Sequence, residues 1–264
     1  MAKPTTANPT PPAPAAWTEN ELKDAHARSD KAERVRSMFA AIAPAYDLNN
    51  RVHSFGRDQA WRRAAVKAAD IKPGDVVADI ACGTGDLTEL LARTDAAQVM
   101  GLDFTQEMLD LAEVKKPRNL TADQAAKVSY QQADAMALPL QDASVDAITI
   151  AFGIRNVQEP GRALAEFARV LKPGGRLVVL EFDRPPLAPV RWGNAFYSGW
   201  LMPRTATLLS RDSSGAYRYL PKSIEQFMTS AELRDRLAEH GFSDLRTRRL
   251  TFGVCACTRG VRSA

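Results

Sequence analysis

In its first third, the chain reads Val76-Val77-Ala78-Asp79-Ile80-Ala81-Cys82-Gly83-Thr84-Gly85-Asp86-Leu87. The first five residues are apolar apart from Asp79, and such a run is typical of a buried strand. Gly83 and Gly85 allow a sharp turn and let backbone N–H groups approach a ligand, where a Cβ would obstruct. Apolar residues recur at helical spacing from Leu87 onward. The segment therefore predicts a strand, a glycine turn and a helix whose N-terminus points at a ligand.

The residues of this turn separate two classes of ligand. A dinucleotide-binding turn has a third glycine three residues after the second, and this chain has Thr88 there. The turn also carries Asp86, whose carboxylate would repel a pyrophosphate. A cationic nucleoside without phosphates, such as S-adenosylmethionine, would not be repelled. We therefore favour S-adenosylmethionine over a nicotinamide dinucleotide.

Acidic residues at the tips of the next strands support a nucleoside ligand. Asp103 lies 20 residues after Gly83, at the end of the segment 99–103. An acid at that place can accept both ribose hydroxyl protons. After the following strand, the Asp134 carboxylate can accept from the exocyclic amine of adenine, and the Ala135 N–H can donate to a ring nitrogen. An N-cap or an exposed loop acid is the alternative for Asp134.

A fourth strand, at 144–150, leads into Ala151-Phe152-Gly153-Ile154-Arg155-Asn156-Val157. Open parallel sheets bind ligands beyond the carboxyl ends of their strands, so we expect this segment to line the cleft. Arg155 and Asn156 are costly to bury unless they hold something polar. A salt-bridged arginine beside a turn asparagine is the alternative. Glu181 ends the fifth strand over the same cleft.

The alternation of strands and helices predicts a doubly wound parallel sheet, closed by an antiparallel hairpin at about 243–257. We expect an α/β, class I S-adenosylmethionine-dependent methyltransferase (Rossmann-like) fold. Its seven-stranded, mostly parallel sheet has an antiparallel last strand. The chain then divides into a disordered tail at 1–17 and a single domain at 18–264. Within this domain we expect a helical cap at 18–70, a cofactor-binding core at 71–184, a helical lid at 185–225, and a last helix and hairpin at 226–264.

Composition sets broad bounds on function. The 264 residues suffice for one sizeable α/β domain, and the net charge of +4 fits an anionic membrane surface or nucleic acid without deciding between them. Three cysteines argue for a reducing compartment rather than a disulfide framework, and we expect no metal. The sequence shows neither a membrane-spanning apolar run nor a signal peptide, which favours the cytoplasm.

The N-terminal part predicts a helical preface that closes over the cleft. We expect a helix at 18–43, a loop at 45–50 that carries Tyr46, and a second helix at 57–69. Tyr46 is the candidate for contact with a ligand, and packing of its ring is the alternative. His53 is interpreted first as a surface or structural histidine.

Large apolar residues gather in the segment 185–220 and predict one or two amphipathic helices before the last strands. They either complete the core as a lid, or form a wall for a lipidic substrate or a membrane-facing patch. Peripheral contact with the inner face of the membrane through this segment, and a homodimer, both stay open.

At this point the sequence resembles a known family. From about residue 34 to 260 it is similar to the ubiquinone/menaquinone biosynthesis C-methyltransferases. The carrying segments are 46–50, 81–86, 151–157, 171–177, 180–182, 217–220 and 223–224. The glycine turn is shared by many small-molecule methyltransferases, whereas segments 152–157 and 217–220 are far more specific.

The resemblance implies methyl transfer from S-adenosylmethionine to a ring carbon of a prenylated quinol. The expected reaction is demethylmenaquinol to menaquinol, the final step of menaquinone biosynthesis. The alternative acceptors are 2-polyprenyl-6-methoxy-1,4-benzoquinol, of ubiquinone biosynthesis, and another small molecule. At position 151 the family usually has Ser, so Ala151 leaves only its backbone for contact. The expected cofactor-binding residues are Asp79, Gly83, Thr84, Gly85, Asp103, Asp134, Ala135 and Ala151.

The chemistry needs an electron-rich ring and a place for the ring hydroxyl proton. Guanidinium is a poor base, so we expect Arg155 to stabilise the developing phenolate or to order a water. Asn156 and Tyr46 would orient the ring, and Glu181 and His53 are weaker candidates for the base. The rival readings are an RNA methyltransferase, for which we find no basic aromatic arm, a non-catalytic binding module and a nicotinamide dehydrogenase.

Overall fold

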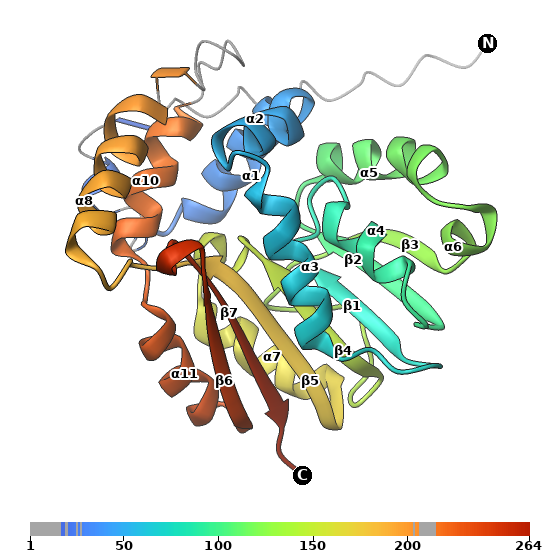
Figure 1. Cartoon of the computed structure of the whole chain (residues 1–264). Helices are drawn as coiled ribbons and strands as arrows, with labels where there is room; N and C mark the ends of the chain where they lie inside the picture. Colours follow the sequence, from blue (N-terminus) through green and yellow to red (C-terminus); the bar gives the residue numbers. More distant parts are fainter. Residues whose placement is uncertain (1–16, 19–20, 25, 27, 203, 206–214) are drawn as a thin grey trace, which may run out of the picture.

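The computed structural model describes residues 17–18, 21–24, 26, 28–202, 204–205 and 215–264. Its centre is a seven-stranded sheet in the order β3-β2-β1-β4-β5-β7-β6 (Figure 1). The strands are β1 (Val76–Ile80), β2 (Gln98–Asp103), β3 (Val128–Gln132), β4 (Val145–Ala151), β5 (Leu171–Phe182), β6 (Phe242–Leu250) and β7 (Cys255–Arg262). The last strand, β7, pairs antiparallel with β5 and β6, and the other pairs are parallel, which confirms the predicted sheet.

Helices cover both faces of the sheet, so the central strands are apolar on both sides. One apolar cluster joins the sheet to α3 (Arg57–Ala69) and α4 (Asp86–Ala92). The other joins it to α7 (Pro160–Val170) and α11 (Ser230–Glu239). In α7 the buried residues recur at helical spacing, namely Ala163, Leu164, Phe167 and Val170.

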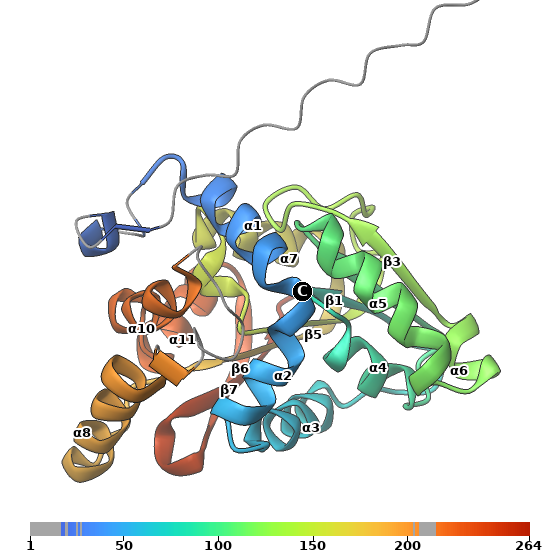
Figure 2. The same cartoon turned by 90° about the horizontal axis from the view of Figure 1, so that it is seen from above.

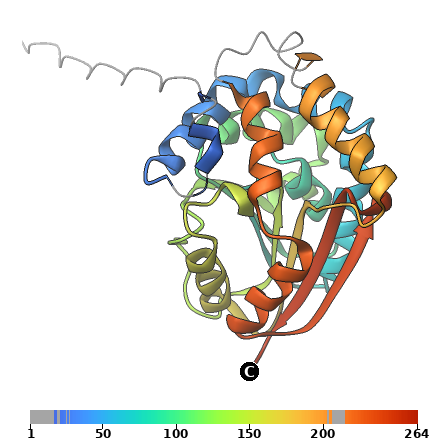
Figure 3. The same cartoon turned by 90° about the vertical axis from the view of Figure 1, so that its left-hand side faces the viewer.

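A third layer lies over the carboxyl ends of the parallel strands (Figure 3). It consists of η1 (Glu21–Asp24), α1 (Lys31–Ile42), η2 (Ala43–Ala45), α2 (Tyr46–His53), α8 (Ala188–Phe196), the π-helix η4 (Tyr197–Leu201) and α10 (Ala216–Gln226). Trp17 ties this layer together by stacking on Tyr219, with ring centroids 4.8 Å apart. The expected tail at 1–17 therefore ends on a buried residue, and its residues 1–16 lie outside the described part.

The structure corrects two local expectations. The predicted helix at 18–43 is interrupted, because α1 begins only at Lys31. The predicted loop at 45–50 is helical instead, because Ala45 ends η2 and residues 46–50 belong to α2. Distant contacts of Asp47 to Thr84 and Lys115 hold α2 in place. Between β2 and β3 the chain forms α5 (Gln106–Asn119) and the short α6 (Ala122–Ala126).

The remaining elements are the 3-10 turns η3 (Ile154–Asn156) and η5 (Thr251–Gly253). The turn η3 follows β4, and η5 joins β6 to β7. Two of the predicted site residues, Arg155 and Asn156, lie in η3. Among the described residues, no helix has the length and apolar character needed to cross a bilayer.

Candidate functional site

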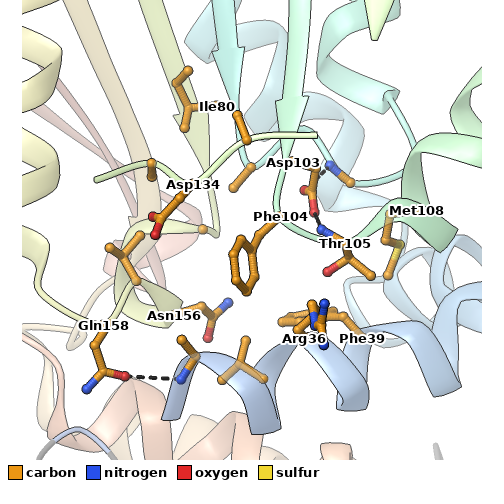
Figure 4. Close-up of a pocket in the computed structure, with 18 of the residues that line it drawn as sticks. Arg36, Phe39, Ile80, Asp103, Phe104, Thr105, Met108, Asp134, Asn156 and Gln158 are labelled. Carbon is orange, nitrogen blue, oxygen red and sulfur yellow. Dashed lines mark hydrogen bonds between the residues drawn. The ribbon is translucent and has the colours of Figure 1, made fainter. Parts of the chain in front are cut away.

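Two cavities lie between the third layer and the strand ends. The first encloses about 780 Å³ of empty space between α1 and the tips of β1 and β2 (Figure 4). The second encloses about 1220 Å³ and lies among α2, α3, α8 and α10. Phe39 and Tyr46 border both cavities. A ligand in the first cavity and a ligand in the second cavity would therefore meet at these two rings.

The glycine turn fixes one wall of the first cavity. Gly83 has a φ of +56° and Gly85 a φ of +86°, values that favour glycine. The Gly83 N–H donates to Asp103 Oδ2, and the Thr105 N–H donates to Oδ1, each at 2.8 Å. Burial raises the pKa of Asp103, while these N–H groups lower it. Each carboxylate oxygen keeps a further lone pair for a ligand.

The opposite wall comes from the loop after β3. Asp134 and Ala135 border the first cavity, and Asp134 Oδ1 accepts from the Met136 N–H at 2.9 Å. Figure 4 shows Asp134 and Asp103 on either side of the Phe104 ring. The structure therefore brings together the predicted Gly83, Asp103, Asp134 and Ala135 around one cavity.

Sequence reasoning missed the roof of this cavity. Val35, Arg36 and Phe39 of α1 border it, as does Phe104. The α1 residues gave no signal, because apolar residues at helical spacing are also what core packing requires. Phe104 offered one, because it directly follows Asp103 at the end of β2. In the structure its ring stays 38% exposed, and the Arg36 guanidinium lies 5.9 Å from the ring centroid.

Four predicted cofactor residues do not border the first cavity: Asp79, Thr84, Gly85 and Ala151. Asp79 lies beneath the turn and accepts from Thr88 Oγ1 at 2.6 Å and Thr149 Oγ1 at 2.7 Å. Burial raises the pKa of Asp79 to about 6. A Cβ at Gly85 would collide with Tyr130 Oη. Asp79 and Gly85 thus shape the turn, and direct contact of these four residues with a cofactor stays a prediction.

Asp86 does not act as the sequence argument assumed. Its Oδ1 accepts from Lys115 Nζ at 2.6 Å, and the same ammonium lies 2.6 Å from Asp47 Oδ2. Although burial opposes ionisation, Lys115 and the nearby Arg62 lower the pKa of Asp86. The charge is therefore compensated within the protein, so repulsion of a pyrophosphate by Asp86 was a wrong premise.

Arg155 is 3% exposed and borders the second cavity. Its Nη1 donates to Glu181 Oε1 at 2.6 Å and to the Phe152 carbonyl at 2.7 Å. Glu181 itself borders neither cavity, and burial raises its pKa. The Arg155 guanidinium is therefore salt-bridged and also faces a cavity, and its role toward a ligand stays a prediction.

Asn156 and Tyr46 lie between the two cavities. Asn156 borders the first cavity, and its Oδ1 accepts from Tyr219 Oη at 3.1 Å. The Tyr46 ring meets Phe39 edge-on at 5.9 Å between centroids. Burial raises the pKa of Tyr46, which keeps its hydroxyl protonated and able to donate. Of the three predicted catalytic residues, Tyr46 therefore borders both cavities, Asn156 the first and Arg155 the second.

Several aromatic side chains border the second cavity. Phe152 and Phe182 lie 4.8 Å apart between centroids, and Trp61 packs on both at about 6 Å. Its polar groups include His53, and Arg155 adds a fixed positive charge. Four charged side chains also border this cavity, namely Asp58, Arg62, Arg155 and Asp183. The cavity therefore suits a flat, largely apolar ligand that carries polar groups. Within the described residues, no three His, Cys, Asp or Glu side chains gather to form a metal site.

Comparison with known proteins identifies close relatives. The family model of the ubiE/COQ5 methyltransferases matches residues 27–262. The demethylmenaquinone methyltransferase of Thermus thermophilus is 45% identical over 226 residues, which cover 85% of this chain and all of the relative. The ubiquinone/menaquinone biosynthesis C-methyltransferase UbiE of Geotalea daltonii is 39% identical over 236 residues, covering 89% and 98%. The resemblance inferred from the sequence is confirmed.

Solved structures share the fold at lower identity. A SAM-dependent methyltransferase of Aquifex aeolicus matches with a TM-score of 0.54 at 18% identity, covering 76% of this chain and 88% of that one. The cyclase SpnF matches with a TM-score of 0.59 at 19% identity, covering 78% and 81%. One is a cyclase, so these likenesses establish the class I fold and not the reaction. The family match and the relatives go further: this chain belongs to the ubiE/COQ5 methyltransferase family.

Proposed function

We propose that this methyltransferase transfers a methyl group from S-adenosylmethionine to a ring carbon of a prenylated quinol. Demethylmenaquinol is the preferred acceptor and menaquinol the product. The observation that carries the proposal is the contact between the two cavities at Phe39 and Tyr46. The Thermus relative is named for demethylmenaquinone, whereas the Geotalea relative is named for both quinones, so a benzoquinol is the second candidate.

The first cavity fits S-adenosylmethionine, which supplies an electrophilic methyl group on a sulfonium. Asp103 borders the cavity with free lone pairs on both oxygens, as acceptors for the ribose hydroxyls. Asp134 and the Ala135 N–H would contact the adenine, and Gly83 allows close approach of the turn. Asp79, Thr84, Gly85 and Ala151 would hold that turn and the end of β4 in place.

The second cavity would hold the quinol ring. Arg155 cannot serve as a base, because its guanidinium stays protonated, but it can stabilise the negative charge that develops on the ring oxygen. Tyr46 and Asn156 would orient the ring toward the methyl group. The helices α8 and α10 would act as the lid that keeps water from the reacting carbon.

Competition between acceptors tests this proposal. Purified protein is incubated with S-adenosylmethionine and an equal mixture of reduced demethylmenaquinol and a methoxy-prenyl-benzoquinol, and products are separated by mass. We expect methylated naphthoquinol to dominate. Methylation of the benzoquinol alone would show that the benzoquinol, and not demethylmenaquinol, is the acceptor. Binding of S-adenosylmethionine without transfer to either ring would reject the acceptor class.

We also propose that α8 and η4 form a peripheral contact with the inner face of the membrane. Trp192, Phe196 and Trp200 recur every four residues and are 72%, 62% and 50% exposed. The opposite side, which includes Asn194 and Ser198, borders the second cavity. The polarity of this helix is therefore inverted, with large apolar rings outside. Figures 1 and 2 show α8 at the outer edge of the molecule.

Charge favours a lipid surface as the occupant of this face. Residues 184–205 contain three arginines and no acidic residue, which suits anionic headgroups. Tryptophan rings favour the boundary between headgroups and acyl chains. Lipid binding would bring the quinol cavity to the layer in which a prenylated quinol is dissolved.

Sedimentation with anionic vesicles measures this contact. Serine at 192, 196 and 200 together should weaken binding more than tenfold, since full burial of one such side chain is worth about 1.5–3 kcal/mol. Val114→Ser, which changes a 50% exposed residue on α5, is the matched control. Vesicle binding that persists in the triple variant would reject the contact. A homodimer that this variant dissolves would show that a second copy covers the face instead.

A further inference from the structure

We propose that His53 is the proton acceptor for the ring hydroxyl of the quinol. The inference rests on the proposed function, because it assigns a role within the acceptor cavity. His53 ends α2 and borders the second cavity together with Arg155. A positive charge at Arg155 would stabilise the phenolate that loss of this proton creates. His53 would therefore take the proton from one ring oxygen, and Arg155 would stabilise the negative charge left on that oxygen.

Hydrogen bonds fix which ring nitrogen of His53 can act as a base. Nδ1 lies 2.9 Å from the Asn49 carbonyl oxygen. A carbonyl oxygen only accepts, so Nδ1 must carry a hydrogen. In the neutral imidazole the lone pair then lies on Nε2. The backbone of α2 thus sets the tautomer that leaves Nε2 as the basic nitrogen.

The Thr205 hydroxyl can form a hydrogen bond with His53 both before and after His53 takes up a proton. Its Oγ1 lies 2.9 Å from His53 Nε2 and 3.2 Å from the Met202 carbonyl oxygen. A hydroxyl can donate to the neutral Nε2. It can instead turn its hydrogen toward Met202 and accept from a protonated Nε2, or free Nε2 for the substrate. Nε2 therefore has a hydrogen-bond partner in both protonation states of the imidazole.

The other candidate bases on the described walls are less suited. The Asp183 carboxylate accepts from Ser230 Oγ at 2.5 Å and from two backbone N–H groups. Asp58 accepts from Ser54 and Gln59 side chains. Burial raises the pKa of the neighbouring tyrosines, that of Tyr219 to about 12, so they are neutral hydroxyls. The charged groups on these walls are Asp58, Arg62, Arg155 and Asp183.

The proposed step balances without a further reagent. The hydroxyl O–H bond breaks and an Nε2–H bond forms. The electron pair of the phenolate drives formation of the carbon–methyl bond while the methyl–sulfur bond breaks, which leaves a neutral thioether. The methylated ring carbon then loses its hydrogen to water as a proton. His53 returns its proton to the ring oxygen, and the quinol is restored.

Two histidines of this chain provide a matched pair for the test. His240 also places Nδ1 against a carbonyl four residues earlier, that of Arg236 at 2.7 Å, but it follows α11 and lies outside the second cavity. We expect His53→Asn to lower kcat by about 100-fold or more, the usual worth of a general base. His240→Asn should keep wild-type turnover. Affinity for S-adenosylmethionine should be unchanged in both variants.

The pH profile and chemical rescue separate a base from a structural residue. Turnover of His53→Asn should rise with pH, because only the ionised quinol would still react, and added imidazole should restore part of it. A loss of turnover that neither pH nor imidazole relieves would overturn the proposal, as would a variant as active as the wild type. Wild-type protein that methylates no quinol would instead reject the proposed function.

Nitrogen NMR tests the geometry independently of turnover. The neutral His53 ring, assigned through the variant, should show a protonated Nδ1 and an unprotonated Nε2. A hydrogen on Nε2 in the neutral ring would overturn the inference, even if the methyl transfer occurs as proposed.

Discussion

Replacing Arg155 by methionine should lower both stability and turnover, and a second substitution separates the two effects. Arg155 and Glu181 form an ion pair at 2.6 Å, with side chains only 4% and 5% exposed. Removing one partner of such a pair costs about 3–5 kcal/mol, because the remaining charge stays buried. Burial already raises the pKa of Glu181, so this carboxyl can take up a proton and limit the loss. We therefore expect about 3 kcal/mol, the lower end of that range.

The sign of the pH dependence follows from the same carboxyl. Without Arg155, the pKa of Glu181 in the folded chain lies further above its unfolded value. The folded state then binds more protons, so the free energy of unfolding is highest below the unfolded pKa and falls as pH rises toward the folded pKa. Adding Glu181→Gln removes both this slope and most of the loss in stability, because no uncompensated charge remains.

Urea unfolding and methyl transfer are measured on the Arg155→Met variant and on the double variant. The double variant should regain stability while its turnover stays about 100-fold or more below wild type, as when a charge-stabilising donor is lost. Turnover that recovers together with stability would refute the reasoning, because Arg155 would then act only through the fold. An equal fall in affinity for S-adenosylmethionine would assign Arg155 to the cofactor cavity instead.

Three further changes test the framework around the site. Gly85→Ala should lower the free energy of unfolding by about 2–4 kcal/mol, and Gly74→Ala by about 1 kcal/mol. Both glycines have a positive φ, but only a Cβ at position 85 meets Tyr130. Equal losses in urea unfolding would contradict this prediction. The pKa of Asp79 is raised from 3.8 to about 6, so stability should fall by about 3 kcal/mol as pH rises through that window. Asp79→Asn should flatten this fall, and an unchanged pH profile would reject the argument. Burial lowers the pKa of Lys31 from 10.5 to about 8, so its contribution to stability should rise with pH between those values. Lys31→Met should remove this rise in pH-dependent unfolding, and a rise that persists would assign it to another group.

The sheet could be predicted because its signals are local. Apolar strands, the turn at Gly83 and Gly85, and the closing hairpin are each read within a dozen residues. The edge that carries Asp103 and Asp134 follows from one rule, that the carboxyl ends of parallel strands meet on one side of the sheet. These features depend on backbone geometry more than on distant partners.

The third layer could not be predicted because distant contacts stabilise it. Asp47 is bound by Lys115, 68 residues away in the sequence, and this contact helps to make α2 a helix where Asn49 and Asn50 suggest a loop. Tertiary contacts of this kind override weak local propensity. The ion-pair partner of Asp86 is also Lys115, and the sequence does not reveal this pair for the same reason.

The candidate site was predicted in part. Arg155 and Asn156 were singled out because polar residues at a strand end are costly to bury, and the structure places both at the cavities. Phe39 shares the wall between them with Tyr46, yet its helical spacing was indistinguishable from core packing. The way α1 crosses the strand ends decides which residues lie between the two cavities. No short segment of the sequence specifies that crossing.

Transfer of a carbon-13 methyl group tests the central claim most directly. The protein is incubated with methyl-labelled S-adenosylmethionine and demethylmenaquinol, reduced in one sample and oxidised in the other, and the product is identified by mass and carbon NMR. We predict one labelled methyl on a ring carbon of the reduced acceptor and none on the oxidised one, since only the quinol is electron-rich. Label on a ring oxygen, equal transfer to the quinone, or no transfer to either would contradict the account.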